Sequence, residues 1–261
     1  MDIAGSVALI TGGAMGIGKG IARQIGLARA TVVIADINEE VARATLSEFE
    51  EAGLTARFVH TDVARDDDVQ RMIDFTLDQF GALDILVNNA GIGMNGVIPG
   101  TPPEVWSEVL HVYLRQYMLG TQIALRAMGD RGGAIVNIAS RAGVGFKPQA
   151  WPEYATAKAG VIRFTSCMGP LKERAGVRVN CICPGWVATE GVRASLEGLS
   201  DEQKRKRDIP DPMLTPEDIG DAALQLIRDD GLAGRVMLYD EPGKKRLIPV
   251  DLDLFALSEE V

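Results

Sequence analysis

The chain alternates short runs of β-branched and other apolar residues with longer segments whose apolar positions recur at helical spacing. The short runs predict strands over residues 7–11, 31–35, 56–60, 85–88, 134–138, 178–182 and 235–239. The longer segments predict helices over residues 16–29, 39–52, 67–80, 103–128, 152–174 and 216–228. Such alternation is typical of right-handed crossovers and of a parallel sheet covered on both faces. The pattern predicts one doubly wound α/β domain over residues 1–261, with about seven strands.

The last third of the chain carries two helix starts and two unusual segments. Thr215-Pro216-Glu217-Asp218 predicts the start of a helix, and Ser200-Asp201-Glu202-Gln203 is a capping box that predicts a short charged helix. Residues 190–213 have low strand propensity and include two prolines, so we expect a mobile lid over a binding site. Residues 240–261 form an atypical tail, which we interpret as a partner surface or a second lid.

Composition and charge argue against a nucleic-acid-binding or membrane-spanning protein. A hydrophobic content of 46% in 261 residues supports one large core, and the net charge of −9 includes no basic stripe, so no nucleic acid is expected as a partner. No apolar run is long enough to span a membrane, and the first residues do not resemble a signal peptide, so we expect a soluble cytoplasmic protein. Among the three cysteines, Cys181 and Cys183 lie on one face of an apolar run, which favours packing over metal binding.

A glycine-rich loop, Thr11-Gly12-Gly13-Ala14-Met15-Gly16-Ile17-Gly18, joins the first predicted strand to the first predicted helix. Gly12 suits a tight turn, Gly16 a close backbone approach and Gly18 the packing of the helix on the strand. The loop can therefore bind a pyrophosphate at a helix N-terminus, in a domain of the Rossmann type. The residues expected to contact a dinucleotide there are Gly12, Met15, Gly16, Ile17 and Gly18.

Asp36 ends the second predicted strand about 20 residues after this loop, where a carboxylate can accept hydrogen bonds from the adenosine ribose. A 2′-phosphate would bring like charges together, and no Arg or Lys lies at Met15, Ile37 or Asn38 to compensate. Asp36 therefore favours NAD over NADP, and we expect Ile37 to contact the adenosine as well. The alternative for Asp36 is an ordinary turn residue.

Tyr154 and Lys158 are four residues apart in a predicted helix, so their side chains share one face. An ammonium beside a phenol, together with an oxidised nicotinamide, would lower the phenol pKa toward neutrality. Tyr154 can then exchange a proton with an alcohol or a carbonyl while a hydride moves to or from the nicotinamide. Ser140 follows the fifth predicted strand at the binding edge of the sheet and can hold the substrate oxygen.

These motifs, in this order, resemble the short-chain dehydrogenase/reductase family as far as about residue 230. The resemblance implies that Lys158 also contacts the nicotinamide ribose. It adds further cofactor contacts, for which capping and turn formation are the structural alternatives. They are Asp62, Val63, Asn89, Ala90, Gly91, Pro184, Gly185, Val187 and Thr189.

The chain departs from the family pattern at Tyr113, which stands where the family usually has a catalytic asparagine that supports a proton relay. A tyrosine lacks the amide, although its hydroxyl could substitute. The spacing from Ser140 to Tyr154 is one residue longer than expected, which places an insertion within residues 143–152, at the substrate entrance.

The substrate contacts expected from the sequence are Met94, Phe146, Trp151 and Trp186. Their apolar character favours a hydrophobic secondary alcohol or ketone; core packing or subunit contact is the alternative. Trp151-Pro152-Glu153-Tyr154 and the tail resemble the 15-hydroxyprostaglandin dehydrogenase branch, too weakly to assign a substrate.

The leading hypothesis is an NAD(H)-dependent oxidoreductase that uses Ser140, Tyr154 and Lys158, with the role of Tyr113 open and no metal. The alternative is a catalytically weak NAD(H)-binding sensor or scaffold of the same fold. The resemblance also implies a homo-dimer or homo-tetramer, formed through the helices predicted over residues 103–128 and 152–174.

Overall fold

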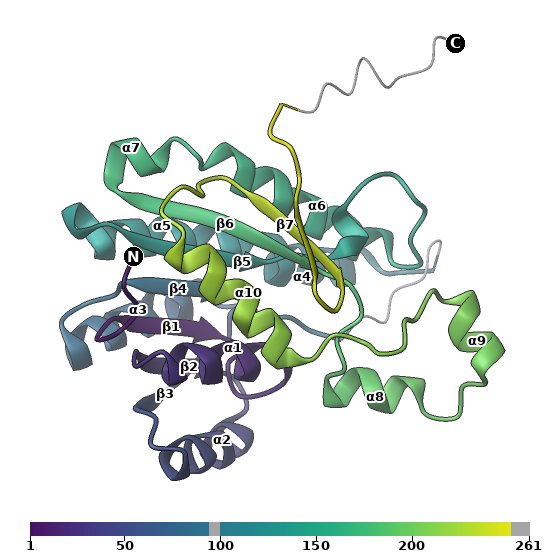
Figure 1. Cartoon of the computed structure of the whole chain (residues 1–261), viewed down its shortest axis with the longest axis horizontal. Helices are drawn as coiled ribbons and strands as arrows, with labels where there is room; N and C mark the ends of the chain where they lie inside the picture. The colour runs from purple at the N-terminus through teal and green to yellow at the C-terminus, as the bar shows by residue number, and fades with distance from the viewer. Residues whose placement is uncertain (94–99, 252–261) are drawn as a thin grey trace.

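The computed structural model describes residues 1–93 and 100–251 and shows an α/β domain built on one mixed sheet (Figure 1). The strand order is β3-β2-β1-β4-β5-β6-β7-β8. Strands β1 to β7 pair in parallel, and β8 pairs with β7 antiparallel. The strands are β1 (Val7–Thr11), β2 (Thr31–Asp36), β3 (Ala56–His60), β4 (Ile85–Asn88), β5 (Gly133–Ile138), β6 (Val177–Pro184), β7 (Val236–Glu241) and β8 (Lys244–Leu247).

The helices join successive parallel strands and lie on both faces of the sheet. They are α1 (Gly16–Leu27), α2 (Glu39–Glu51), α3 (Asp66–Phe80), α4 (Pro103–Leu110), α5 (Gln116–Met128), α6 (Pro152–Cys167), α7 (Leu171–Ala175), α8 (Glu190–Leu196), α9 (Asp201–Lys206) and α10 (Pro216–Arg228). Three shorter helical turns are η1 (His111–Arg115), η2 (Gly129–Arg131) and η3 (Arg141–Gly143). Helices α8 and α9 lie beyond the carboxyl ends of the strands (Figure 1).

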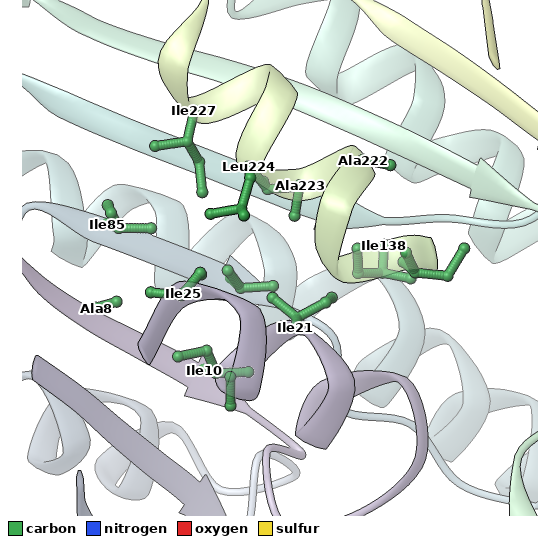
Figure 2. Close-up of a cluster of buried hydrophobic side chains, with 14 of the residues drawn as sticks. Ala8, Ile10, Ile21, Ile25, Ile85, Ile138, Ala222, Ala223, Leu224 and Ile227 are labelled. Carbon is green, nitrogen blue, oxygen red and sulfur yellow. The ribbon is translucent and has the colours of Figure 1, made fainter. Parts of the chain in front are cut away.

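Alternation along the strands divides the core between the two faces of the sheet. Ala8 and Ile10 of β1 pack with α1, α2 and α10, whereas Leu9 packs with α3 and α5 on the opposite face. Figure 2 shows the first face, where Ile21 and Ile25 of α1 point toward side chains of β1 and β4 and of helix α10. Both faces are buried, as the near-continuous apolar strands require.

Most predicted elements are confirmed, two predicted helices are divided, and strand β8 and helix α8 were not predicted. The helix predicted over residues 103–128 is interrupted by the π-helical turn η1. The helix predicted over residues 152–174 ends at Cys167, because Pro170 starts a separate helix, α7. The eighth strand was not predicted, since Lys244–Leu247 is short, charged and largely exposed, as suits an edge strand.

The predicted capping box at Ser200 and the predicted helix start at Thr215 are both confirmed, and Thr215 also forms a capping box. Ser200 caps α9 and Thr215 caps α10, and in each box the third helical residue returns a hydrogen bond to the backbone of the cap. Residues 190–213, expected as a lid, hold α8, α9 and a connection that ends near the β6 loop, where Leu214 N donates to Trp186 O at 3.0 Å. The segment that contains α8 and α9 therefore returns to the carboxyl edge of the sheet.

Candidate active site

The glycine loop connects β1 to α1 and leaves the N-terminus of α1 uncapped. Among the described residues, no side chain caps α1, and its first turn holds no acidic residue. Helices α2, α8, α9 and α10 have both side-chain caps and acidic first turns. Helices α3, α4, α6 and α7 lack a side-chain cap, as α1 does, but each has an acidic residue in its first turn. Exposed N–H groups at the positive end of a helix fit an anionic phosphate. The loop is therefore suited to a dinucleotide pyrophosphate.

Close backbone packing explains two of the loop glycines. A Cβ added to Gly18 would lie 2.0 Å from Gly12 O, and a Cβ added to Gly12 would lie 2.9 Å from Ala90 Cα. Gly12 also has a positive φ of 62°. Any side chain at either position would push the loop away from β1 or from the segment after β4.

Asn89 and Thr11 tie the loop to β4. The Asn89 amide donates to Thr11 O at 3.0 Å and to Gly12 O at 3.1 Å. The Thr11 hydroxyl accepts from the backbone N–H groups of Asn89 at 2.9 Å and Ala90 at 3.1 Å. Asn89 and Ala90, expected as cofactor contacts, therefore help shape the cradle.

Asp36 is the last residue of β2, and its side chain is 8% exposed. One carboxylate oxygen accepts from Ala14 N at 3.1 Å and the other from Asn38 N at 3.0 Å. Asp36 thus makes the expected turn contact and also anchors the glycine loop. Met15 and Ile37 are exposed beside it, at 44% and 60%.

Lys158 of α6 is buried, with 3% of its surface exposed. Its Nζ donates to Ile138 O at 2.7 Å and to the Tyr117 hydroxyl at 3.0 Å. Burial lowers the pKa of Lys158 to about 7, because desolvation disfavours the charged ammonium. The ammonium also lies 5.8 Å from the centre of the Tyr154 ring.

Tyr154 of α6 contacts Ser140, which follows β5. Burial raises the pKa of Tyr154, and a hydrogen bond with the Ser140 side chain opposes that rise. Ser140 Oγ also accepts from Ala142 N at 3.1 Å at the start of η3. The phenol, the hydroxyl and the ammonium of Lys158 therefore occupy one neighbourhood.

Tyr113 lies in η1, and its ring packs edge-to-face on Tyr154 with 4.9 Å between ring centres. Its hydroxyl donates to Ile92 O, and burial raises its pKa. The hydroxyl that contacts Lys158 belongs instead to Tyr117, one turn later. Sequence reasoning missed Tyr117, although its spacing of four residues from Tyr113 placed both on one helical face.

A second feature missed from the sequence is a buried amide network behind the site. Asn88 Nδ2 donates to Asn137 Oδ1 at 2.9 Å, and Asn137 Nδ2 donates to Thr165 Oγ1 at 2.9 Å. All three residues are buried. The network joins β4, β5 and α6, the elements that carry Asn89, Ser140 and Lys158 toward the edge.

Several other predicted cofactor contacts also serve structural roles. Asp62 Oδ1 accepts from Ala64 N at 2.9 Å, so Asp62 forms a turn next to the half-buried Val63. Thr189 caps α8, and its Cγ2 lies 3.3 Å from the Cβ position built on Gly16. Pro184 ends β6, and Gly185 and Val187 lie in the connection that leads from it to Thr189.

The predicted substrate residues are spread around this edge. Phe146 is 92% exposed, Trp151 is 40% exposed, and Trp186 is half-buried; Met94 lies outside the described residues. A cavity of about 590 Å³ lies between α8 and α9. None of these three aromatic residues lines it; its lining includes Arg193, Leu196, Lys204, Ile209 and Met213.

Residues 1–93 and 100–251 contain no cluster of His, Cys, Asp or Glu that could hold a metal ion. Cys181 and Cys183 pack in the core with their sulfur atoms 4.0 Å apart. No helix in these described ranges is long and apolar enough to cross a membrane.

The fold and site define a nicotinamide-binding oxidoreductase in which a tyrosine, a lysine and a serine meet at the carboxyl edge of a parallel sheet. The sequence profile described as "short chain dehydrogenase" matches residues 6–199. The chain belongs to the short-chain dehydrogenase/reductase family, as its motifs predicted, and acts on CH–OH groups.

Three similar proteins indicate the range of this family. The (2S)-[(R)-hydroxy(phenyl)methyl]succinyl-CoA dehydrogenase subunit BbsD of Thauera aromatica is 36% identical over 91% of this chain and 96% of its own length. The 15-hydroxyprostaglandin dehydrogenase [NAD(+)] of Mus musculus is 35% identical over 91% of this chain and 90% of its own. A variant of actinorhodin polyketide ketoreductase, solved with NADPH, is 30% identical with a TM-score of 0.81, covering 90% of this chain and 95% of that chain.

The buried ammonium gives a prediction for stability. The folded pKa of Lys158, about 7, lies below the usual value of 10.5, so between these values the unfolded chain holds the proton more tightly. The free energy of unfolding should therefore rise with pH, by up to about 1.4 kcal/mol per pH unit from this group.

Urea unfolding of the wild-type protein and of Lys158→Met at pH 7 and pH 9 measures this contribution. Relative to Lys158→Met, the wild type should gain stability as the pH rises. An equal change in both proteins would show that Lys158 titrates normally.

Proposed function

We propose that the protein transfers a hydride between NAD and a hydrophobic secondary alcohol or its ketone. The observation that carries this proposal is the meeting of Ser140, Tyr154 and Lys158 at the carboxyl edge of the parallel sheet, the same edge at which the glycine loop leads from β1 into the uncapped helix α1. The glycine loop is suited to the pyrophosphate and Asp36 to the adenosine ribose, and Tyr154 can exchange a proton with the substrate oxygen.

The roles of the side chains follow from their chemistry. Ser140 donates a hydrogen bond to the substrate oxygen, which fixes that oxygen next to the Tyr154 hydroxyl. During oxidation, Tyr154 as a phenolate takes the hydroxyl proton while the carbon loses a hydride and the C–O bond becomes a carbonyl. During reduction, Tyr154 returns that proton to the oxygen. The nicotinamide, when bound, accepts or supplies the hydride.

The cofactor has a second effect on this proton transfer. In the protein alone, burial raises the pKa of Tyr154, which favours the neutral phenol. The positive charge of an oxidised nicotinamide, added to that of Lys158, would favour the phenolate. Tyr154 therefore becomes a base when oxidised cofactor is present, which couples proton removal to the correct redox state.

The choice of NAD depends on Asp36. Its carboxylate is held by Ala14 N and Asn38 N, so it cannot turn away from a 2′-phosphate without losing both hydrogen bonds. The related mouse enzyme is named for NAD(+), whereas the related ketoreductase was solved with NADPH. The family thus accommodates both cofactors, and the negative charge of Asp36 favours NAD.

The substrate proposal combines the aromatic residues at the entrance with the lid. Phe146 and Trp151 lie exposed on the loop before α6, and we propose that residues 190–213 close over the substrate beside them. The names of the Thauera and mouse relatives both specify a hydroxyl-bearing substrate, a hydroxy(phenyl)methyl succinyl-CoA and a 15-hydroxyprostaglandin.

Activity should depend on the Tyr154 hydroxyl. NADH formation from a panel of hydrophobic secondary alcohols, with the reverse ketone reactions, should identify a substrate, and Tyr154→Phe should lower kcat/KM by about 10²-fold or more. Tyr239→Phe, which removes a buried phenol outside the site, is the matched control. Turnover that survives Tyr154→Phe would exclude this mechanism, and cofactor binding without turnover of any substrate would favour a sensor or scaffold.

Cofactor choice can be tested at the same carboxylate. The wild type should prefer NAD to NADP in kcat/KM, and Asp36→Asn, which keeps an oxygen acceptor, should lower that preference by about tenfold or more. Glu39→Gln removes a nearby exposed charge and should leave the preference unchanged. Equal use of both cofactors by the wild type would contradict the assignment.

We also propose a homo-dimer or homo-tetramer. A shallow groove on α5 and α6 is lined by Met118, Leu125, Phe164 and Met168, and Met118 is 45% exposed, which suits a second copy of the chain. Sedimentation should show a dimer or tetramer that Met118→Glu weakens. A strictly monomeric wild type would exclude this assembly.

A further inference from the structure

Lys158 has two described hydrogen-bond acceptors, and only one of them comes from a side chain. Its Nζ donates to the backbone oxygen of Ile138 at 2.7 Å and to the hydroxyl of Tyr117 at 3.0 Å. The centres of the Tyr113 and Tyr117 rings each lie 4.7 Å from Nζ. Aromatic faces attract a cation but do not accept its protons in a fixed direction. Beside the backbone oxygen of Ile138, the Tyr117 hydroxyl is therefore the side-chain group, among the described residues, that can orient the ammonium.

The surroundings of Tyr117 fix the direction of its own proton. The residue is completely buried, and its hydroxyl can donate to Ile138 O at 3.1 Å or to Ala90 O at 3.4 Å. Because its proton is directed toward these backbone oxygens, a lone pair remains for the ammonium. Both oxygens lie within the protein, so the contact from Lys158 through Tyr117 does not lead to solvent.

Tyr113 cannot take this role in the observed arrangement. Its hydroxyl donates to Ile92 O, and it offers Lys158 the face of its ring. The two tyrosines of the η1–α5 segment thus have different contacts: the Tyr113 ring packs on Tyr154, and the Tyr117 hydroxyl accepts a hydrogen bond from Lys158.

We propose that Tyr117 is a positioning residue for catalysis, which holds the Lys158 ammonium through its hydroxyl and keeps it next to Tyr154. This inference depends on the proposed function, because positioning Lys158 matters for turnover only if Tyr154 and Lys158 perform the chemistry. The role requires a buried oxygen at position 117, not merely an aromatic ring. Tyr117→Phe keeps the ring and removes that oxygen.

The first test measures Lys158 directly, without substrate or cofactor. The ¹⁵Nζ and ¹³Cε NMR signals of Lys158, assigned by their loss in Lys158→Met, are followed as the pH changes. Losing an acceptor destabilises the ammonium, so Tyr117→Phe should raise the acid dissociation constant of Lys158 by about tenfold. Tyr113→Phe removes a hydroxyl that does not contact Lys158 and should leave this constant unchanged.

The second test uses turnover, once a substrate is known. Tyr117→Phe should lower kcat by about tenfold at neutral pH, leave the substrate KM within about twofold, and move the alkaline limb of the pH profile toward lower pH. An effect through stability alone would lower the melting temperature without moving that limb.

The two readouts separate the inference from the function on which it depends. A changed Lys158 titration in a protein that turns over no substrate would support the contact and reject the proposed function. An active protein with unchanged titration and pH profile in Tyr117→Phe would overturn the inference. If Tyr117→Phe does not fold, nuclear Overhauser contacts between the Lys158 ammonium protons and the Tyr117 ring in the wild type decide; their absence would also overturn it.

Discussion

In a parallel sheet whose two faces are buried, polar side chains can reach solvent and ligands mainly at the ends of the strands. In this protein β1, β2, β4, β5 and β6 all end at one edge, and β2, β4 and β5 have polar residues at or just after their ends. Asp36, Asn89 and Ser140 are examples, each at the carboxyl end of a different strand. The proposed sites for the two ends of a dinucleotide therefore follow from the strand order.

Lys158 is the main exception, because it enters the interior from a helix. Desolvating an ammonium is costly, and its lowered pKa reflects that cost. A backbone oxygen, a tyrosine hydroxyl and three aromatic rings offset part of it. Because these contacts offset only part of the desolvation cost, the protonation of Lys158 is sensitive to any charge that binds nearby. Such sensitivity suits a residue whose effect on Tyr154 should depend on the bound cofactor.

Sequence reasoning located features that depend on local spacing and failed where long-range geometry decides. Asp36 at a strand end and the Tyr154–Lys158 spacing could be predicted, because strand length and helical period determine them. The π-helical turn was invisible, since the apolar periodicity of residues 103–128 reads as one helix. The contact between Tyr117 and Lys158 depends on how α5 and α6 are rotated against each other, and no short-range pattern encodes that rotation.

Tyr113 stands where the family resemblance implies an asparagine, and its ring affects the space around Lys158. An asparagine there would leave space near the lysine that water could fill, whereas the Tyr113 ring occupies space between Gly91 and Tyr154. With that space filled, the ammonium must find its acceptors within the protein, and Tyr117 supplies the nearest side-chain oxygen. The two tyrosines are therefore best understood as a pair: one fills the space, and the other provides the hydrogen bond that a water would otherwise make.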